Sequence, residues 1–218
     1  MIAVALLLLT PLVAGFASLG LRRADALHGV NLTAMLVLAG AQAVTMMRVV
    51  QHGGFRAYHD LVAVDALSAY VLLIITGIGF TCSLYTRSYF EHYRAQGTIS
   101  PIRMSRYFFL FHMFMFTMIL ATLANSLGIL WVSIEATTLA TTFLVNFFKR
   151  KASLEAGWKY LILCSVGIAL ALFGTVLLYL SSVRALGDVS GALNVTELLR
   201  AADQLDPHAV KVAFIFIL

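Results

Sequence analysis

The chain has 218 residues, of which 61% are hydrophobic and only 11% are charged, with a formal net charge of +5. A soluble globular domain carries about 25% charged residues, so a water-soluble fold of this composition is excluded. The basic residues gather between apolar runs, as in membrane proteins, and so do not indicate a nucleic-acid partner. The composition predicts an all-α integral membrane protein whose main surroundings are the lipid bilayer.

Several apolar runs are long enough to cross a bilayer core of about 30 Å, which needs about 20 residues of helix. The predicted spans are 1–21, 29–47, 61–85, 107–124, 127–148 and 156–182. A further run begins at Ala209, after a polar stretch. We expect a single transmembrane domain over 1–218, with six complete helices and the start of a seventh. We interpret the sequence as the N-terminal fragment of a longer subunit, or as one that another polypeptide completes.

The connections between these spans differ in basic charge. The connections after spans one, three and five carry nine basic residues: Arg22, Arg23, Arg87, Arg94, Arg103, Arg106, Lys149, Arg150 and Lys151. The connections after spans two, four and six carry four: Arg48, Arg56, Arg184 and Arg200. Because basic loops stay in the cytoplasm, we predict a multi-pass protein of the inner (plasma) membrane with its N-terminus outside.

Glu135 is the leading candidate for function, because it lies near the midpoint of the fifth span. An ionisable group at mid-membrane costs roughly 2.5–3.5 kcal/mol on insertion scales and usually marks an ion pathway or a structural ion pair. Thr138, Thr142 and Asn146 follow at helical spacing on the same face. A carboxyl group with hydroxyl and amide neighbours suits a hydrated proton relay. The alternative is a protonated side chain that only joins helices by hydrogen bonding.

Three further polar positions allow two interpretations each. Lys159, four residues after Glu155, either belongs to the pathway or forms an i, i+4 ion pair. Asp65 either caps the third helix, which we favour, or joins a channel mouth. His112, in the fourth span, is expected to be buried and hydrogen-bonded, with a relay role as the alternative.

Other chemistries find no support in the sequence. Cys82 and Cys164 are expected to be free, buried thiols, since neither belongs to a metal-ligand or disulfide pattern. No catalytic, cofactor-binding or metal-binding motif is present. Gly167, Ala171 and Gly174 in the sixth span suit close helix packing.

Three segments carry a resemblance to a known family: Trp131–Glu135, Ser153–Leu161 and Tyr85–Tyr89. They resemble the antiporter-like, proton-pumping subunits shared by respiratory complex I, multisubunit sodium/proton antiporters and membrane-bound nickel–iron hydrogenases. Among these, the sequence is most similar to the component F type of hydrogenase-4, the formate hydrogenlyase type. The resemblance runs from about Asp65 to the end of the chain.

The resemblance implies that the chain is part of the first of two inverted repeats in a longer antiporter-like bundle. It places the family's fifth-span glutamate at Glu135 and its sixth-span lysine at Lys159. The resemblance places the family's lysine of the broken seventh helix about ten residues after Leu218, so Lys211, at the outer end of that run, does not match it. We expect a non-catalytic subunit of a membrane oxidoreductase complex that moves protons as electrons are transferred, with other membrane subunits as partners. The alternatives are a sodium/proton antiporter subunit and a truncated, non-conducting assembly protein.

Overall fold

The computed structural model describes residues 1–96, 99–148, 151–187 and 191–218. Six of the described helices are long and apolar enough to cross a membrane, which confirms the predicted all-α membrane fold. The elements are α1 Ile2–Gly20, α2 Ala24–His52, β1 Phe55–Ala57, β2 Val62–Val64, α3 Ala66–Ala95, α4 Pro101–Leu123, α5 Leu127–Val145, α6 Lys151–Leu186, α7 Val195–Arg200, a 3-10 turn Ala202–Gln204 and α8 Pro207–Ile217.

Several helices differ in length from the apolar runs that predicted them. Helices α2 and α6 extend beyond their runs at both ends, because polar residues continue the helix after the hydrocarbon-compatible part has ended. Helix α3 begins at Ala66 and not at residue 61, because the apolar residues before it form β2. Val62 and Val64 of that strand are apolar because they are buried. In the sequence they therefore look like the start of a membrane span.

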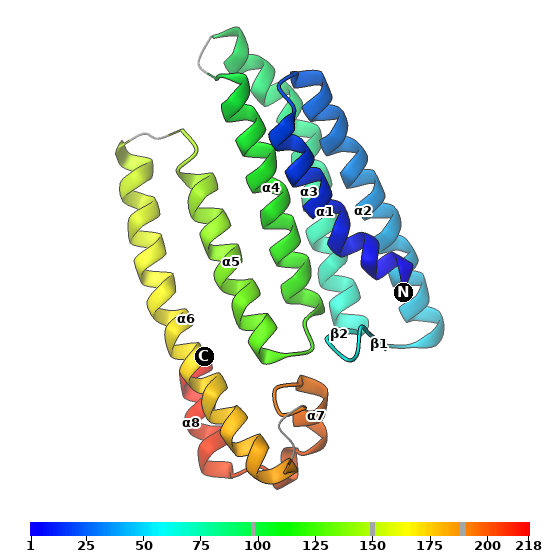
Figure 1. The fold of residues 1–218 in the computed structure, drawn as a ribbon, viewed down its shortest axis with the longest axis vertical. Helices are drawn as coiled ribbons and strands as arrows, with labels where there is room; N and C mark the ends of the chain where they lie inside the picture. Colours follow the sequence, from blue (N-terminus) through cyan, green and yellow to red (C-terminus); the bar gives the residue numbers. More distant parts are fainter. Residues whose placement is uncertain (97–98, 149–150, 188–190) are drawn as a thin grey trace.

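The first four long helices form a bundle, and the remaining ones extend it sideways (Figure 1). Helix α5 packs on α4, α6 packs on α5, and α8 packs on α6. The core of the bundle combines side chains from α1 to α4, including Leu7, Leu38, Leu72 and Ile119. Helix α6 is the least enclosed, with only 11% of its most apolar segment buried inside the chain. Its outer face therefore meets lipid or another protein.

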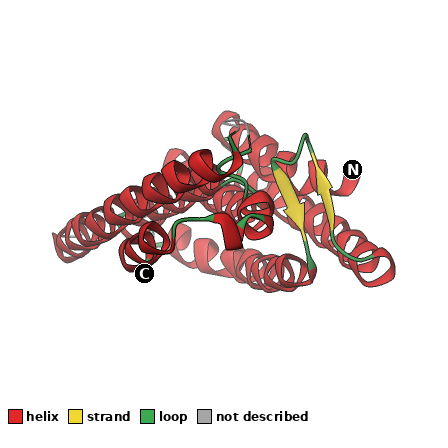
Figure 2. Cartoon of the chain, turned by 90° about the horizontal axis from the view of Figure 1, so that it is seen from below, coloured by secondary structure: helices red, strands yellow, loops and turns green. Residues whose placement is uncertain are grey.

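A network of hydrogen bonds and an ion pair joins the segments at the end of the bundle where β1 and β2 lie (Figures 1 and 2). Asn125, between α4 and α5, donates its side-chain N–H to the carbonyl of Asp60 at 2.8 Å. Its backbone carbonyl accepts from the N–H of Val195 at 2.7 Å, so the hairpin, the α4–α5 connection and α7 are joined. Arg56 of β1 lies 3.4 Å from Glu197 of α7 and adds an ion pair.

Asp65 caps α3, as predicted from its place before the helix. Its Oδ1 atom accepts the backbone N–H of Ser68 at 2.6 Å. This hydrogen bond lowers the pKa of the Asp65 carboxyl group. Capping accounts for the aspartate without a channel role.

The helices alternate in direction, so the two classes of connection lie at opposite ends (Figure 1). The described members of the nine-residue basic set lie at one end, hereafter the basic end; Lys149 and Arg150 fall outside the described residues. The hairpin, the α4–α5 connection and α7 lie at the other end. The fold thus separates charge in the way that the positive-inside interpretation requires.

Two glycines of α6 make a matched test of helix packing. A Cβ atom at Gly174 would lie 2.6 Å from the carbonyl oxygen of Ala213 in α8, whereas one at Gly167 would meet nothing within 4 Å. We predict that Gly174→Ala forces α8 away from α6 at a cost of about 1–3 kcal/mol, because a backbone atom cannot yield as a side chain can. Gly167→Ala should have no such cost. Hydrogen exchange of the α8 amides measures the difference, and equal exchange in both variants would contradict the close contact.

Candidate functional site

The carboxyl group of Glu135 lies on α5, one turn after Trp131, and its side chain is half-buried. Its Oε2 atom is fully enclosed and has no hydrogen-bond partner among the described residues. An enclosed carboxylate oxygen without a partner is unfavourable by roughly 1–3 kcal/mol, and more if the group is charged. This oxygen is therefore open to a further hydrogen-bond donor, such as a water molecule.

Two buried threonines continue the face that Glu135 begins. The Thr138 hydroxyl donates to the carbonyl of Ile134 at 3.1 Å, and the Thr142 hydroxyl donates to the carbonyl of Thr138 at 2.8 Å. Each hydroxyl proton is thus used within α5, while each oxygen keeps lone pairs for a further donor. The structure places Glu135, Thr138 and Thr142 on one polar face of α5, as their spacing predicted.

The same face ends at Asn146, the residue that follows the last turn of α5. A Cβ atom at Gly157 of α6 would lie 2.1 Å from Nδ2 of Asn146, so the asparagine side chain occupies the space that glycine leaves. The Oδ1 atom of Asn146 is enclosed and has no partner among the described residues. A second unsatisfied acceptor therefore lies at the basic end of this polar face.

Contacts with α6 show which side of α5 carries these groups. The indole N–H of Trp131 donates to the carbonyl oxygen of Ile168 at 2.7 Å. The Tyr160 phenol lies beside the Thr138 hydroxyl, and Asn146 meets Gly157. Since the two helices run in opposite directions, this register places Glu135 about level with Cys164. The polar face of α5 is thus directed toward α6.

Lys159 does not reach this face. Its ammonium group lies 2.5 Å from Glu155, four residues earlier, and the two side chains are 75% and 68% exposed. Both residues belong to the described part of the chain, in which no ion pair joins Lys159 to Glu135. The i, i+4 pairing is the simpler of the two predicted roles, and it leaves the lysine at the outer surface of α6.

His112 is also separate from Glu135. Its side chain is completely buried in α4, where its Cβ atom packs against Gly15 of α1. The prediction of burial is confirmed, but the predicted hydrogen bond is wrong: neither ring nitrogen has a partner among the described residues. The cause is the setting, which is aromatic and aliphatic, with the Phe111 ring centroid 5.6 Å from that of the imidazole.

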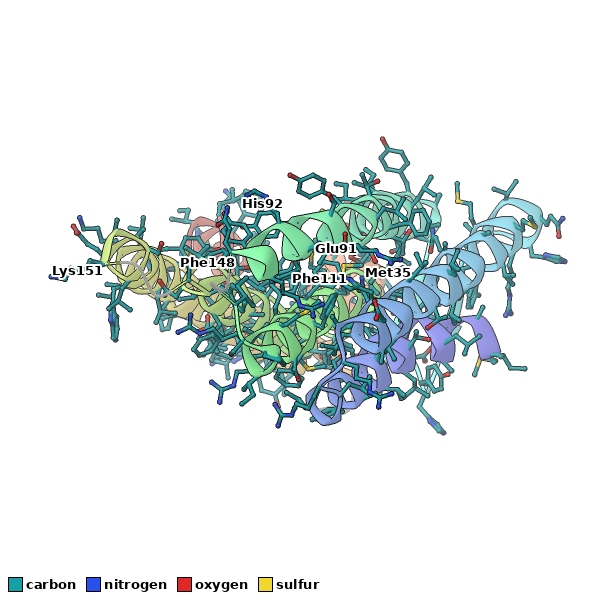
Figure 3. The ribbon with its side chains drawn as sticks, turned by 90° about the horizontal axis from the view of Figure 1, so that it is seen from above. Met35, Glu91, His92, Phe111, Phe148 and Lys151 are labelled. Atoms are coloured by element: carbon teal, nitrogen blue, oxygen red, sulfur yellow. The ribbon has the colours of Figure 1, made fainter. Side chains whose placement is uncertain are left out.

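At the basic end, the α1–α4 bundle lies on one side and the α5–α6 pair lies on the other. Viewed from that end, Figure 3 shows Met35 and Phe111 within the α1–α4 bundle and Lys151 on α6 at the opposite edge. Between them, Phe147 and Phe148 follow α5 and contact Tyr89 and Tyr107 of the neighbouring helices. An aromatic cluster thus separates the core of the bundle from the α5–α6 face.

Sequence reasoning missed two contributors to the α5–α6 contact. Trp131 begins a segment in which a role was predicted for Glu135 alone, yet its indole forms a polar link between the helices. Gly157 has no periodic partner in the sequence, and its importance depends on where Asn146 ends α5. A tryptophan in a mid-membrane run was the available signal, because its N–H needs a partner there.

Comparison with known proteins gives a consistent result. Residues 124–218 match the transmembrane family described as NADH:quinone oxidoreductase/Mrp antiporter. A hydrogenase-4 component F homolog of Methylacidiphilum infernorum (isolate V4) is 42% identical over 155 residues, which are 71% of this chain and 33% of that relative. The chain thus spans about a third of the length of this curated relative.

A solved structure supports the fold over nearly the whole chain. It is that of the membrane-bound sulfane sulfur reductase, an archaeal respiratory membrane complex. One of its chains aligns with a TM-score of 0.78 at 21% identity, covering 98% of this chain and 43% of that one. The arrangement of helices, including the sideways extension beyond α4, is therefore shared with that chain.

The two tryptophans of the chain test the α5–α6 link. Trp131→Phe keeps an aromatic ring but removes the N–H donor to Ile168, so we expect a loss of about 0.5–1.5 kcal/mol and faster hydrogen exchange in the adjoining turns of α6. Trp158→Phe is the control, because Trp158 lies on α6 itself and is 58% exposed. Equal protection of these amides in both variants would show that the indole hydrogen bond does not hold α6 in place.

Proposed function

Because this chain belongs to the family of antiporter-like membrane subunits, we propose that it takes part in proton translocation driven by electron transfer. The parent assembly is a hydrogenase-type or complex-I-like complex, in keeping with the name of the relative from Methylacidiphilum infernorum. Within it, Glu135 is the relay carboxyl group at mid-membrane.

One observation carries the role of Glu135: an enclosed carboxylate oxygen without a partner, on a polar face directed toward α6. A carboxyl group used only to join helices would bond to a donor on the neighbouring helix, because an unmet acceptor in the bilayer is costly. A group that must gain and release a proton benefits from an unmet acceptor, since neither charge state is then locked by a fixed partner.

Thr138 and Thr142 extend this relay toward the basic end. Their oxygens can accept from water while their protons stay on backbone carbonyls, which orients a short water chain along α5. In this proposal, Lys159 and Glu155 form an exposed ion pair at the end of the same helix pair, where the proton meets water. His112 lies on the side of α4 that faces α1, away from α5, so a role in the relay would require a separate branch of the proton pathway.

The proposal also includes partners and orientation. The exposed face of α6 provides the area on which other membrane subunits can pack, as expected for a component of a larger complex. The separation of basic residues supports a plasma-membrane protein whose N-terminus is outside.

Replacing a single atom of Glu135 tests the relay. Glu135→Gln keeps the volume and an accepting carbonyl but cannot release a proton, so proton uptake by proteoliposomes that hold the whole complex should be lost or fall at least about tenfold. Electron transfer, measured in parallel, should be retained in part. Lys159→Ala should have a milder effect, because water or Glu155 can replace an exposed ammonium group.

Glu197→Gln is the matched control, since Glu197 is paired with Arg56 and Arg200 at the opposite end. It should leave proton uptake unchanged. Proton uptake at the wild-type rate in the Glu135→Gln complex would show that Glu135 is only a packing group.

Cysteine labelling tests the orientation in intact cells after Cys82 and Cys164 are replaced by serine. Gln96→Cys at the basic end should be protected from an impermeant thiol reagent, whereas Asp203→Cys at the opposite end should react. The expectation follows from the separation of charge between the two ends. The reverse labelling pattern would place the N-terminus in the cytoplasm.

A further inference from the structure

A second polar zone lies in the α1–α4 bundle, away from Glu135. A cavity of about 300 Å³ opens between α2 and α3 at the basic end, and its lining includes Asp25, His28, Leu32, Ser83, Leu84 and Arg87. At roughly 30 Å³ for each molecule of liquid water, the cavity has room for several waters. None of these residues belongs to the polar face of α5.

The buried wall of this cavity carries polar atoms without hydrogen-bond partners. His28 is only 9% exposed, and its Nε2 atom has no hydrogen-bond partner among the described residues. Behind the wall, the Asn31 amide donates to the Ser83 hydroxyl, while its own Oδ1 atom is enclosed and unpartnered. Unsatisfied acceptors in a buried site favour a ligand that brings positive charge or hydrogen-bond donors.

Charges of both signs surround His28: Arg87 and Arg94 oppose a cation there, and Glu91 and Asp25 favour one. Arg87 donates its Nε–H to Glu91 at 3.2 Å, so its charge is already balanced on α3 (Figure 3 labels Glu91). Asp25, in the first turn of α2, takes part in no ion pair among the described residues. Arg94 also acts on His28 from further along α3. Helix α4 contributes the Phe108 ring, whose centroid lies 5.3 Å from that of the imidazole.

An apolar plug closes the inner end of the cavity. Beyond Asn31, the side chains of Met35 and Leu38 on α2 are 1% and 0% exposed. Met115 of α4 fills the space beside Gly79 of α3, where a Cβ atom would lie 2.6 Å from its terminal methyl group. The inner end of the cavity is therefore closed toward the interior of the bundle.

We propose that this cavity is a one-sided cation site, which takes up a hydronium or sodium ion from the basic end. The Asp25 carboxylate and the Ser83 hydroxyl supply oxygen ligands, His28 supplies a nitrogen acceptor, and Asn31 positions Ser83. Because Met35, Leu38 and Met115 block the way onward, the ion returns to the side from which it came. The site is thus distinct from the relay at Glu135 and does not rest on it.

Histidine NMR tests occupancy and distinguishes the two ions. The whole subunit, labelled with ¹⁵N-histidine, is studied in lipid bilayers, and His28→Gln identifies the His28 signal by its loss. One series lowers the pH from about 8.5 to about 5.5, on either side of the usual imidazole range, without sodium. The other series replaces choline by sodium at constant pH.

The His28 signal should move in the proton series if the ligand is hydronium, and in the sodium series if it is sodium. Asp25→Asn should weaken the response about tenfold, as expected when an opposing charge that acts on His28 is removed. Asp203→Asn, at the opposite end, is the control and should change nothing. A silent signal in both series, or a response that Asp25→Asn leaves unchanged, would overturn the site.

Thiol labelling tests the one-sided opening. In the chain without Cys82 and Cys164, Ser83→Cys should react with an impermeant reagent applied from the basic end and not from the other. Ile78→Cys is the control on the same helix, since Ile78 is 60% exposed on a hydrophobic surface and should react from neither side. Reaction of Ser83→Cys from both sides would show that the plug does not close.

Discussion

The contact between α5 and α6 determines what the carboxyl group of Glu135 can do. In a bilayer, no solvent satisfies polar atoms, so each buried acceptor depends on the neighbouring helix. Helix α6 offers the Ile168 carbonyl to Trp131 and a bare backbone to Asn146, but no donor to Oε2 of Glu135. The two helices are therefore held together above and below the carboxyl group, whose Oε2 atom has no partner among the described residues.

Glycines set how closely the helices of this chain approach. Helix association in lipid gains little from the hydrophobic effect and depends on van der Waals contact, which is best where side chains are absent. Gly157 and Gly174 of α6 receive Asn146 and the backbone of α8, and Gly79 of α3 receives Met115. The missing side chain has two different consequences: at Gly157 it makes room for a polar group, and at Gly79 it makes room for the apolar plug.

The existence of the membrane helices followed from the sequence, because a run of apolar residues has only one stable form in lipid. Their ends did not, since hydropathy measures the hydrocarbon-compatible part and not the helix. The polar face from Glu135 to Asn146 was predictable from period alone, because it lies within one helix. The α2–α3 cavity was not, because His28 and Ser83 are 55 positions apart and meet only through helix packing. Likewise, spacing grouped Gly167 with Gly174, but only the latter meets α8.

The acidic residues of the basic end show how orientation and cation access can coexist there. In the proposed orientation, arginines and lysines of the connections face the cytoplasm, and their positive potential lowers the local concentration of cations. Three acids lie at this end, namely Asp25, Glu91 and Glu155. The first two act on His28 beside the α2–α3 cavity, and the third pairs with Lys159 at the end of the α5–α6 pair. In the two proposals, negative charge next to each polar zone offsets the basic loops along the route of the cation.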